Sequence, residues 1–371
     1  MQYFDFCSEK ISRLGFGLMR LPQCKDGSID EEKTAEMVDY AIQSGVNYFD
    51  TAWFYHHGES ERVAGRILSR YPRSSFHLAS KFPSTEIRDS DSAKRIFETQ
   101  LEKCQTDHFD FYLLHNVCES TIEPFTSKQF GILDYLLEQK AQGRIRHFGC
   151  STHAGNDAFA QFIDTFGESL EFCQIELNYL DWTLQDAKKK CEILTEHRIP
   201  IWVMEPVRGG RLAKLPASAE ALLRSLRPED SIPAWAFRWV MGVPNVGVIL
   251  SGMSNLEQMQ DNIKTFSSAP AMTPEENELL LSLGDKLKDF LPCTGCRYCC
   301  DGCPMSIDIP RMISVLNEVR YDHNAAALGT LSDVDSDCLP SACVGCGQCE
   351  QICPQHIGIP AALEELATQM K

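Results

Sequence analysis

Short apolar runs alternate with amphipathic helical stretches between residues 10 and 285. The apolar runs have the length of buried strands and lie at 14–17, 48–51, 78–81, 111–115, 148–151, 174–177, 202–206 and 248–251. The stretches between them place apolar side chains at helical spacing, at 31–44, 59–70, 92–103, 132–142, 157–166, 186–197, 232–241 and 255–266. This alternation predicts a parallel α/β sheet, and eight such units fit a closed (β/α)8 TIM barrel better than an open sheet.

The rest of the chain has a different pattern. A further helix is predicted at 273–290, and it leads into Cys293 without a flexible linker sequence. Another helical stretch at 309–320 is followed by a polar run at 332–337. The length of 371 residues also exceeds what a single core usually supports. We therefore predict two domains, a barrel at 1–285 and a small, mostly helical domain at 286–371.

The second predicted domain contains one cysteine spacing twice. Both copies read C-x2-C-x2-C-x3-C-P, and the second follows the first by 50 residues. Two-cluster bacterial ferredoxins have this spacing, and the fourth cysteine of each copy binds the other copy's cluster. We predict a ferredoxin-type domain with two [4Fe-4S] clusters, one bound by Cys293, Cys296, Cys299 and Cys353, the other by Cys343, Cys346, Cys349 and Cys303.

Zinc is the alternative metal for these cysteines, because CxxC pairs also form tetrahedral zinc sites. Zinc gives no reason for the third cysteine of each copy or for the proline that follows the fourth. Cys300 is interpreted as a bystander beside Cys299, and Cys338 has no assigned role.

The composition restricts the classes of function. Ten of the 17 cysteines lie between residues 293 and 353, and the others are single, which favours reduced thiols and metal ligands over disulfides. The net charge of -17 disfavours nucleic acid as a partner. No apolar run is long enough to span a membrane, and the first residues lack the pattern of a signal peptide. We expect a cytoplasmic protein.

Polar side chains stand at the ends of three predicted strands and in one loop. Asp50, Lys81 and His115 end the second, third and fourth strands, and Tyr55 follows Asp50 in the loop. Because the strand ends of a barrel converge, we predict that these four residues meet and act in catalysis. Asp50 would hold Lys81, whose charge would lower the pKa of Tyr55. Tyr55 would then donate a proton to a carbonyl oxygen that His115 orients.

Four segments resemble the signature segments of aldo-keto reductases. They are FDTAWFYHHGESE (49–61), LASK (78–81), FYLLH (111–115) and LGFGLMRLP (14–22). The resemblance covers about residues 10 to 285, and it implies a TIM barrel that reduces aldehydes and ketones with NADPH. The C-terminal part resembles the ferredoxin-type domain that is fused to a bacterial branch of this family.

The resemblance also implies positions for a nicotinamide cofactor. Ser151 and Gln174 match the residues that hold the nicotinamide amide, whereas Thr152 and Met204 replace a common asparagine and a common aromatic. The family's usual Lys or Arg for the 2′-phosphate is absent, so NADH and NADPH both stay open. Residues for the adenosine phosphates and the pyrophosphate are Ser251, Gly252, Met253, Asn255, Gln258 and Asn262, with Arg208 and Gly210.

Three functional hypotheses follow. The first is a nicotinamide-dependent oxidoreductase for small carbonyl substrates, with structural, sensing or accessory clusters. The second is an electron-transfer enzyme whose clusters connect a ferredoxin or flavoprotein to the barrel. The third is a barrel that only supports a cluster-based sensor. A flavin could couple hydride and one-electron steps, but the sequence has no flavin-specific motif.

Overall fold

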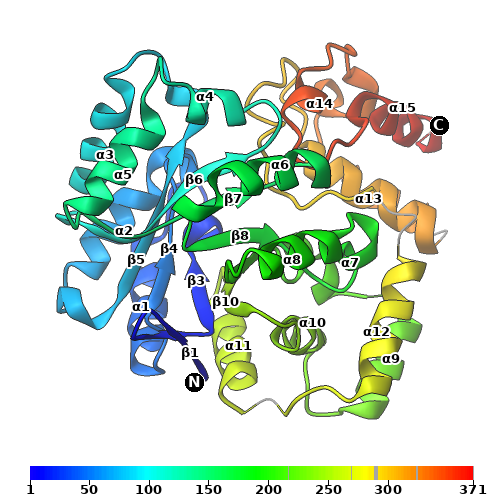
Figure 1. Ribbon diagram of the computed structural model, residues 1–371. Coiled ribbons are helices and arrows are strands. Elements are labelled where there is room, and N and C mark those ends of the chain that lie inside the picture. The colour runs from blue at the N-terminus through cyan, green and yellow to red at the C-terminus, as the bar shows by residue number, and fades with distance from the viewer. Residues whose placement is uncertain (216, 269, 288–290, 323–324, 371) are drawn as a thin grey trace. The chain divides into compact units, whose positions relative to one another are not determined.

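The computed structural model describes residues 1–371 except 216, 269, 288–290, 323–324 and 371. Within these residues, eight parallel strands close into a barrel in the order β10-β3-β4-β5-β6-β7-β8-β9 (Figure 1). The predicted barrel is confirmed, and each predicted strand has a counterpart. The barrel strands are β3 (Leu14–Gly17), β4 (Tyr48–Asp50), β5 (His77–Pro83), β6 (Phe109–Val117), β7 (Ile145–Thr152), β8 (Phe172–Glu176), β9 (Ile201–Met204) and β10 (Val246–Ser251).

The predicted helices between the strands are also present. They are α1 (Glu31–Gln43), α2 (Ser60–Leu68), α3 (Ser92–Lys103), α5 (Ile132–Ala141), α6 (Asn156–Phe166), α8 (Ala187–Glu196), α10 (Ile232–Met241) and α11 (Leu256–Ser268). Asp30 caps the first of them by accepting a hydrogen bond from the Lys33 N–H group. The loops add α4 (Ile122–Thr126), α7 (Asp181–Leu184) and α9 (Ala217–Leu226). The predicted helix at 273–290 corresponds to α12 (Pro274–Lys286), and its last predicted residues, 288–290, lie outside the described part.

An N-terminal hairpin was missed by the sequence analysis. It consists of β1 (Tyr3–Phe6) and β2 (Glu9–Ser12), which pair antiparallel. Its two turn residues, Cys7 and Ser8, have positive φ angles of 47° and 70°. Two-residue hairpin turns are usually recognised in a sequence by Asn-Gly or a similar glycine-containing pair. The pair Cys7-Ser8 is not of this kind. The hairpin therefore carries no turn signal that a reader of the sequence could find.

The hairpin packs against the amino-terminal end of the barrel. The ring of Phe6 lies 5.1 Å from that of Trp202 and 5.9 Å from that of Phe111. These rings join an apolar cluster inside the barrel that includes Tyr48 and Phe172, each of which begins a strand. Because the core fills this end, the carboxyl ends of the strands are left to carry polar groups.

The described residues form two compact units. Unit 1 consists of 1–206 and 233–277 and contains the barrel; unit 2 consists of 207–232 and 278–371. The segment at 207–232 contacts the rest of unit 2: the Arg208 guanidinium donates to Gln355 Oε1 at 3.4 Å. Gly209, at φ 63°, lies so close to Thr294 that a side chain would collide with the Thr294 carbonyl. The single boundary at 285/286 stays a prediction.

Unit 2 repeats its backbone conformation with the same offset as its cysteines. Its longer helices after the first cysteine set, α13 (Ile309–Asp322) and α15 (Ile359–Gln369), begin 50 residues apart, and the shorter α14 is Gln348–Ile352. Positive φ angles also recur in pairs at this offset, at 295 and 345, 297 and 347, and 306 and 356. The predicted internal repeat and the helical character of this part are confirmed. None of the helices in the described part of the chain has the length and apolar character that crossing a membrane requires.

Candidate active site and cluster-binding sites

A buried lysine connects three of the four predicted catalytic residues. Lys81, on β5, has no solvent-exposed surface. Its Nζ atom lies 2.5 Å from Oδ1 of Asp50, 2.9 Å from the Thr51 carbonyl oxygen and 3.3 Å from the Tyr55 hydroxyl. Asp50 ends β4, and Tyr55 begins a short 3-10 helix, η2 (Tyr55–Gly58). The structure thus brings Asp50, Lys81 and Tyr55 into direct contact at the carboxyl ends of two neighbouring strands.

Burial acts on both charges of this pair. It lowers the pKa of Lys81, and the nearby Asp50 carboxylate opposes that shift. Burial likewise raises the pKa of Asp50, and Lys81 opposes it. Separated from the other, each charge would be costly to bury. Each of the two groups therefore stays ionised only because the opposite charge lies beside it.

The pKa of Tyr55 differs from what the sequence led us to expect. Burial raises it well above its usual value, and the Asp50 and Glu205 carboxylates add to this effect, against a smaller opposing effect of Arg20. The expected lowering of the Tyr55 pKa is wrong for this structure, because the loss of solvent is the largest cause of the shift and it raises the pKa. Tyr55 is therefore fully protonated at neutral pH, which is the state that a proton donor requires.

His115, on β6, lies beside Tyr55. The two ring centroids lie 6.0 Å apart, with ring planes 85° from each other. Burial lowers the pKa of His115 well below its usual value, and the charge of Lys81 has the same effect. His115 is therefore neutral at physiological pH and can offer one N–H group without adding a charge.

Two buried amide oxygens near the ends of β6 and β8 lack hydrogen-bond partners. They are Oδ1 of Asn116 and Oε1 of Gln174. The Ser151 hydroxyl accepts a bond from the Asn116 N–H group at 2.9 Å and still has its own proton to donate. A carboxamide needs both a donor and acceptors. Ser151 and Gln174 therefore fit the nicotinamide amide that the sequence assigned to them.

The predicted adenosine-phosphate loop joins β10 to α11. Asn262 donates to the Ser251 hydroxyl at 3.0 Å, and Asn255 accepts from the Gln258 N–H group at 2.9 Å, which caps the helix. Met253 is buried. Gly252 lies against the side chain of Arg20, since a Cβ atom there would meet Arg20 at 3.1 Å. The loop thus offers a helix N-terminus together with a nearby cation, a combination that suits anions.

Two cavities in unit 2 each collect four cysteines. One is lined by Cys293, Cys296, Cys299 and Cys353. The other is lined by Cys303, Cys343, Cys346 and Cys349. Each therefore takes three cysteines from one copy of the repeat and the fourth from the other. Neither cavity is lined by Cys300 or Cys338.

Apolar side chains surround the cysteines. Cys299 and Cys349 are buried in a core with Ile307, Leu316 and Leu363. Further isoleucines and prolines line both cavities. A largely apolar shell around cysteine sulfurs suits an iron–sulfur cluster, whose potential depends on such surroundings.

The sequence profile of the Aldo/keto reductase family matches residues 13–283. The chain belongs to this family. A second profile, that of the 4Fe-4S dicluster domain, matches residues 292–357. This aldo/keto reductase is therefore an oxidoreductase of the NAD(P)H-dependent class with a C-terminal iron–sulfur domain, as the resemblance implied.

Curated relatives match most of the barrel. An uncharacterised oxidoreductase of Bacillus subtilis (strain 168) is 24% identical over 304 residues, which cover 73% of this chain and 92% of the relative. An NADH-specific methylglyoxal reductase of Escherichia coli (strain K12) is 22% identical, with 69% of this chain and 90% of the relative covered.

Solved structures show the same fold. An aldo-keto reductase from Bacillus halodurans, in its holo form, has a TM-score of 0.60 at 24% identity and covers 76% of this chain and 96% of its own. An aldo/keto reductase from Klebsiella pneumoniae in complex with NADP and acetate has a TM-score of 0.62 at 19% identity, with 74% and 92% covered.

Some residues around the site of this aldo/keto reductase escaped the sequence analysis. Glu61, on α2, is fully buried and accepts bonds from Ser80 and Gln100 next to Lys81. Arg20 lies 3.6 Å from Glu205, which follows β9. The sequence could have indicated Glu61, because a carboxylate on the apolar face of a predicted helix needs a buried hydrogen-bond partner. Nothing in the sequence indicated a role for Arg20, since only the fold brings it to the loop at 251–254.

Arg208 and Gly210 belong to unit 2 in this aldo/keto reductase, on η6 (Arg208–Ala213). Arg208 is 1% exposed and hydrogen-bonded to Gln355, which lines the first cysteine cavity. Gly210 has a φ of 96°. Their role as pyrophosphate ligands stays a prediction, and the structure adds the cluster site as a neighbour of Arg208.

Proposed function

We propose that this protein reduces an aldehyde or ketone with NAD(P)H, with Tyr55 as the proton donor. The observation that carries the proposal is the position of Lys81, which touches both Asp50 and Tyr55 inside the protein. A buried ammonium beside a protonated phenol provides both a donor and a means of stabilising the anion that the donor leaves behind.

The roles follow from the contacts. A nicotinamide held by Ser151 and Gln174 would supply a hydride to the carbonyl carbon. Tyr55 gives its proton to the carbonyl oxygen. The carbonyl compound thus gains one hydride and one proton and becomes an alcohol. Lys81, 3.3 Å away, stabilises the phenolate that results, and Asp50 keeps Lys81 charged. Neutral His115 donates a hydrogen bond that orients the carbonyl.

The cofactor residues are part of the proposal. Ser151 and Gln174 would hold the nicotinamide amide, and the free Gln174 oxygen supports this assignment. The loop with Ser251, Gly252 and Asn255 would hold the adenosine end, with Arg20 as the cation beside it. The relatives leave both forms open, because one is NADH-specific and another was solved with NADP.

We also propose two [4Fe-4S] clusters with crossed ligands. The two cavities support this, since each contains the four cysteines that the spacing assigned to one cluster. Bound clusters pass single electrons. This favours a second candidate function, in which a ferredoxin or flavoprotein exchanges electrons with the clusters and these serve the barrel site.

The first proposal is tested with anaerobically prepared protein that contains its clusters. NADH or NADPH oxidation is followed with a panel of small aldehydes and ketones that includes methylglyoxal. Tyr55→Phe should lower kcat by about 10²- to 10⁴-fold, while cofactor binding, measured by fluorescence, stays the same. Tyr3→Phe is the control, because Tyr3 is exposed on the hairpin. Equal rates for wild type and Tyr55→Phe would refute the assigned role.

The second candidate is tested by titration with reduced ferredoxin in the absence of nicotinamide. It predicts that the cluster absorbance bleaches and that carbonyl substrate is consumed. Bleaching without turnover would assign the clusters a role apart from the barrel reaction, and no bleaching would contradict electron transfer from such a partner.

A further inference from the structure

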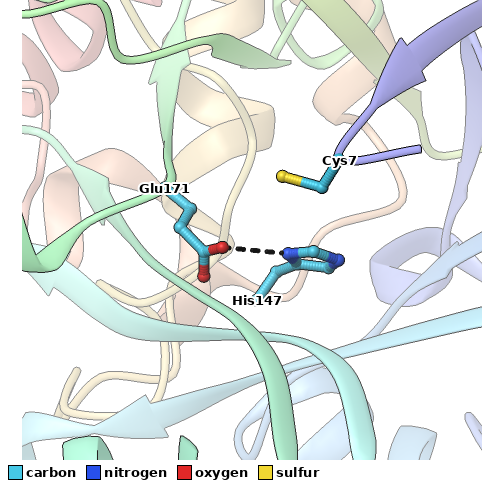
Figure 2. A group of neighbouring side chains, drawn as sticks. All are labelled: Cys7, His147 and Glu171. Carbon is cyan, nitrogen blue, oxygen red and sulfur yellow. Dashed lines mark hydrogen bonds and ion pairs between the residues drawn. The ribbon is translucent and has the colours of Figure 1, made fainter. Parts of the chain in front are cut away.

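Three potential metal ligands meet at the amino-terminal end of the barrel. They are Cys7 in the turn of the hairpin, His147 on β7 and Glu171 just before β8 (Figure 2). One ligand atom from each lies within 4.8 Å of the others. The catalytic residues of the proposed reaction stand on other strands, towards the carboxyl ends of β4, β5 and β6, so this group has no part in that chemistry.

One oxygen of Glu171 is held by groups outside the three residues, and the other faces His147. Its Oε2 atom accepts the Phe148 N–H group at 3.0 Å and lies 2.8 Å from the Lys140 ammonium. Its Oε1 atom faces Nδ1 of His147 at 3.2 Å. The Phe148 N–H group and Lys140 thus fix the carboxylate through Oε2. Oε1, on the side of His147, is positioned to bind a metal ion.

His147 is fixed in a similar way. It is 8% exposed, and its ring lies 4.9 Å from the rings of Phe6 and Phe111. Its Nε2 atom faces Oε2 of Glu9 at 3.5 Å. Histidines that bind metals usually donate their second ring N–H to a carboxylate. Glu9 is in the right place for that, and the same oxygen lies 3.6 Å from Nδ1 of His77.

Cys7 completes the group from the hairpin. Figure 2 shows the Cys7 side chain next to those of His147 and Glu171. The backbone of Cys7 has a φ of 47°, a region in which a side chain other than Asn, Asp or Gly is uncommon. Cys7 is exposed, so the core gains nothing from its sulfur. A thiol in this position is better explained by binding than by packing.

We propose that Cys7, His147 and Glu171 bind a zinc ion through Sγ, Nδ1 and Oε1. Zinc accepts this mixture of sulfur, nitrogen and oxygen, whereas magnesium and calcium prefer oxygen alone. On binding, the thiol loses its proton, and His147 takes the tautomer that carries its proton on Nε2, facing Glu9. Exposed Cys7 leaves a fourth position open to water. The ion fastens the hairpin to β7 and the start of β8.

The experiment uses anaerobically prepared protein with intact clusters, because empty cluster cysteines would also bind zinc. Zinc chloride is titrated against a chromophoric chelator, and zinc, iron and sulfide are quantified in each sample. Wild type should retain one zinc per chain. X-ray absorption at the zinc edge should show one sulfur at about 2.3 Å and lighter ligands at about 2.0–2.1 Å.

Three variants and one control test the ligands. Cys7→Ser and His147→Gln should each weaken zinc binding at least about 100-fold, and Glu9→Gln about 10- to 100-fold. Cys24→Ser should leave it unchanged, because Cys24 is an exposed cysteine outside the group. Cys7→Ser changes one exposed turn atom and is expected to fold even if His147→Gln does not.

Two results would overturn the proposal. One is unchanged zinc affinity in Cys7→Ser at equal iron and sulfide content. The other is a wild type that yields all its zinc to a chelator of micromolar affinity, which would leave the His147–Glu171 pair as a structural contact.

Discussion

The barrel site and the cluster sites organise their reactive groups in opposite ways. In the barrel, Lys81 already has Asp50, the Thr51 carbonyl and Tyr55 as partners. In unit 2, the cysteines surround two cavities and form part of the wall of a small apolar core. The barrel is therefore preorganised by its own side chains, whereas in unit 2 we expect the proposed clusters to complete the interior.

Removal of the clusters tests this contrast most strongly. We expect oxidative cluster loss under chelation to abolish the ordered structure of unit 2, because its thiols would be left around two unfilled cavities. Hydrogen exchange measured by mass spectrometry should rise by orders of magnitude in peptides from 291–366. Peptides from β4 to β6 should change little. Equal protection of both regions before and after cluster loss would contradict the comparison.

Breaking the buried ion pair tests the barrel side. Lys81→Met should lower the free energy of unfolding by about 3–5 kcal/mol, because it leaves the Asp50 carboxylate buried without its partner. It should also reduce kcat to the level of Tyr55→Phe. Chemical denaturation of the cluster-loaded protein, followed by barrel tryptophan fluorescence, measures the first effect.

The double variant Asp50→Leu/Lys81→Met separates stability from activity. Replacing both charges with apolar groups should restore most of the stability, because no lone charge remains, but none of the activity. If Lys81→Met alone were as stable as wild type, the claim that the pair organises the site would be wrong.

A smaller effect is expected at Asp110, a buried carboxylate at the amino-terminal end of β6. Burial opposes its ionisation, but the hydrogen bonds and charges of His108, Arg73 and the Leu78 N–H group outweigh it and lower the pKa of Asp110 to about 2. The folded-state pKa lies below the ordinary value, so the stabilisation is present above about pH 4 and is lost as pH falls towards 2. The shift corresponds to about 2 kcal/mol.

Asp110→Asn should therefore lower the stability of the barrel by about 2 kcal/mol at pH 7 and flatten its decline between pH 4 and 2. Urea denaturation at a series of pH values measures both. Asp107→Asn is the matched control, since Asp107 is three residues away and largely exposed. If the stability of Asp110→Asn fell between pH 4 and 2 as steeply as that of wild type, other carboxylates would govern the acid dependence.

The barrel and the cluster domain could be predicted from local patterns. Alternating apolar runs and helical stretches predicted all eight strands of the barrel, and the repeated cysteine spacing predicted which four cysteines line each cavity. The N-terminal hairpin could not be predicted in this way, because Cys7 and Ser8 form its turn without a turn sequence. The contact of Arg208 with Gln355 was equally hidden, since 147 residues separate the two.

By itself, the sequence determined the residues whose chemistry is local: strand ends with Asp50, Lys81 and His115, and cysteines whose spacing follows the geometry of a cluster. The tertiary structure alone decided the environment of those residues. Burial raised the pKa of Tyr55 against the expected influence of Lys81, and chain closure brought Cys7 to His147 and Glu171 across the barrel end. Desolvation and long-range contact depend on every element that packs around a site, and no local pattern contains that information.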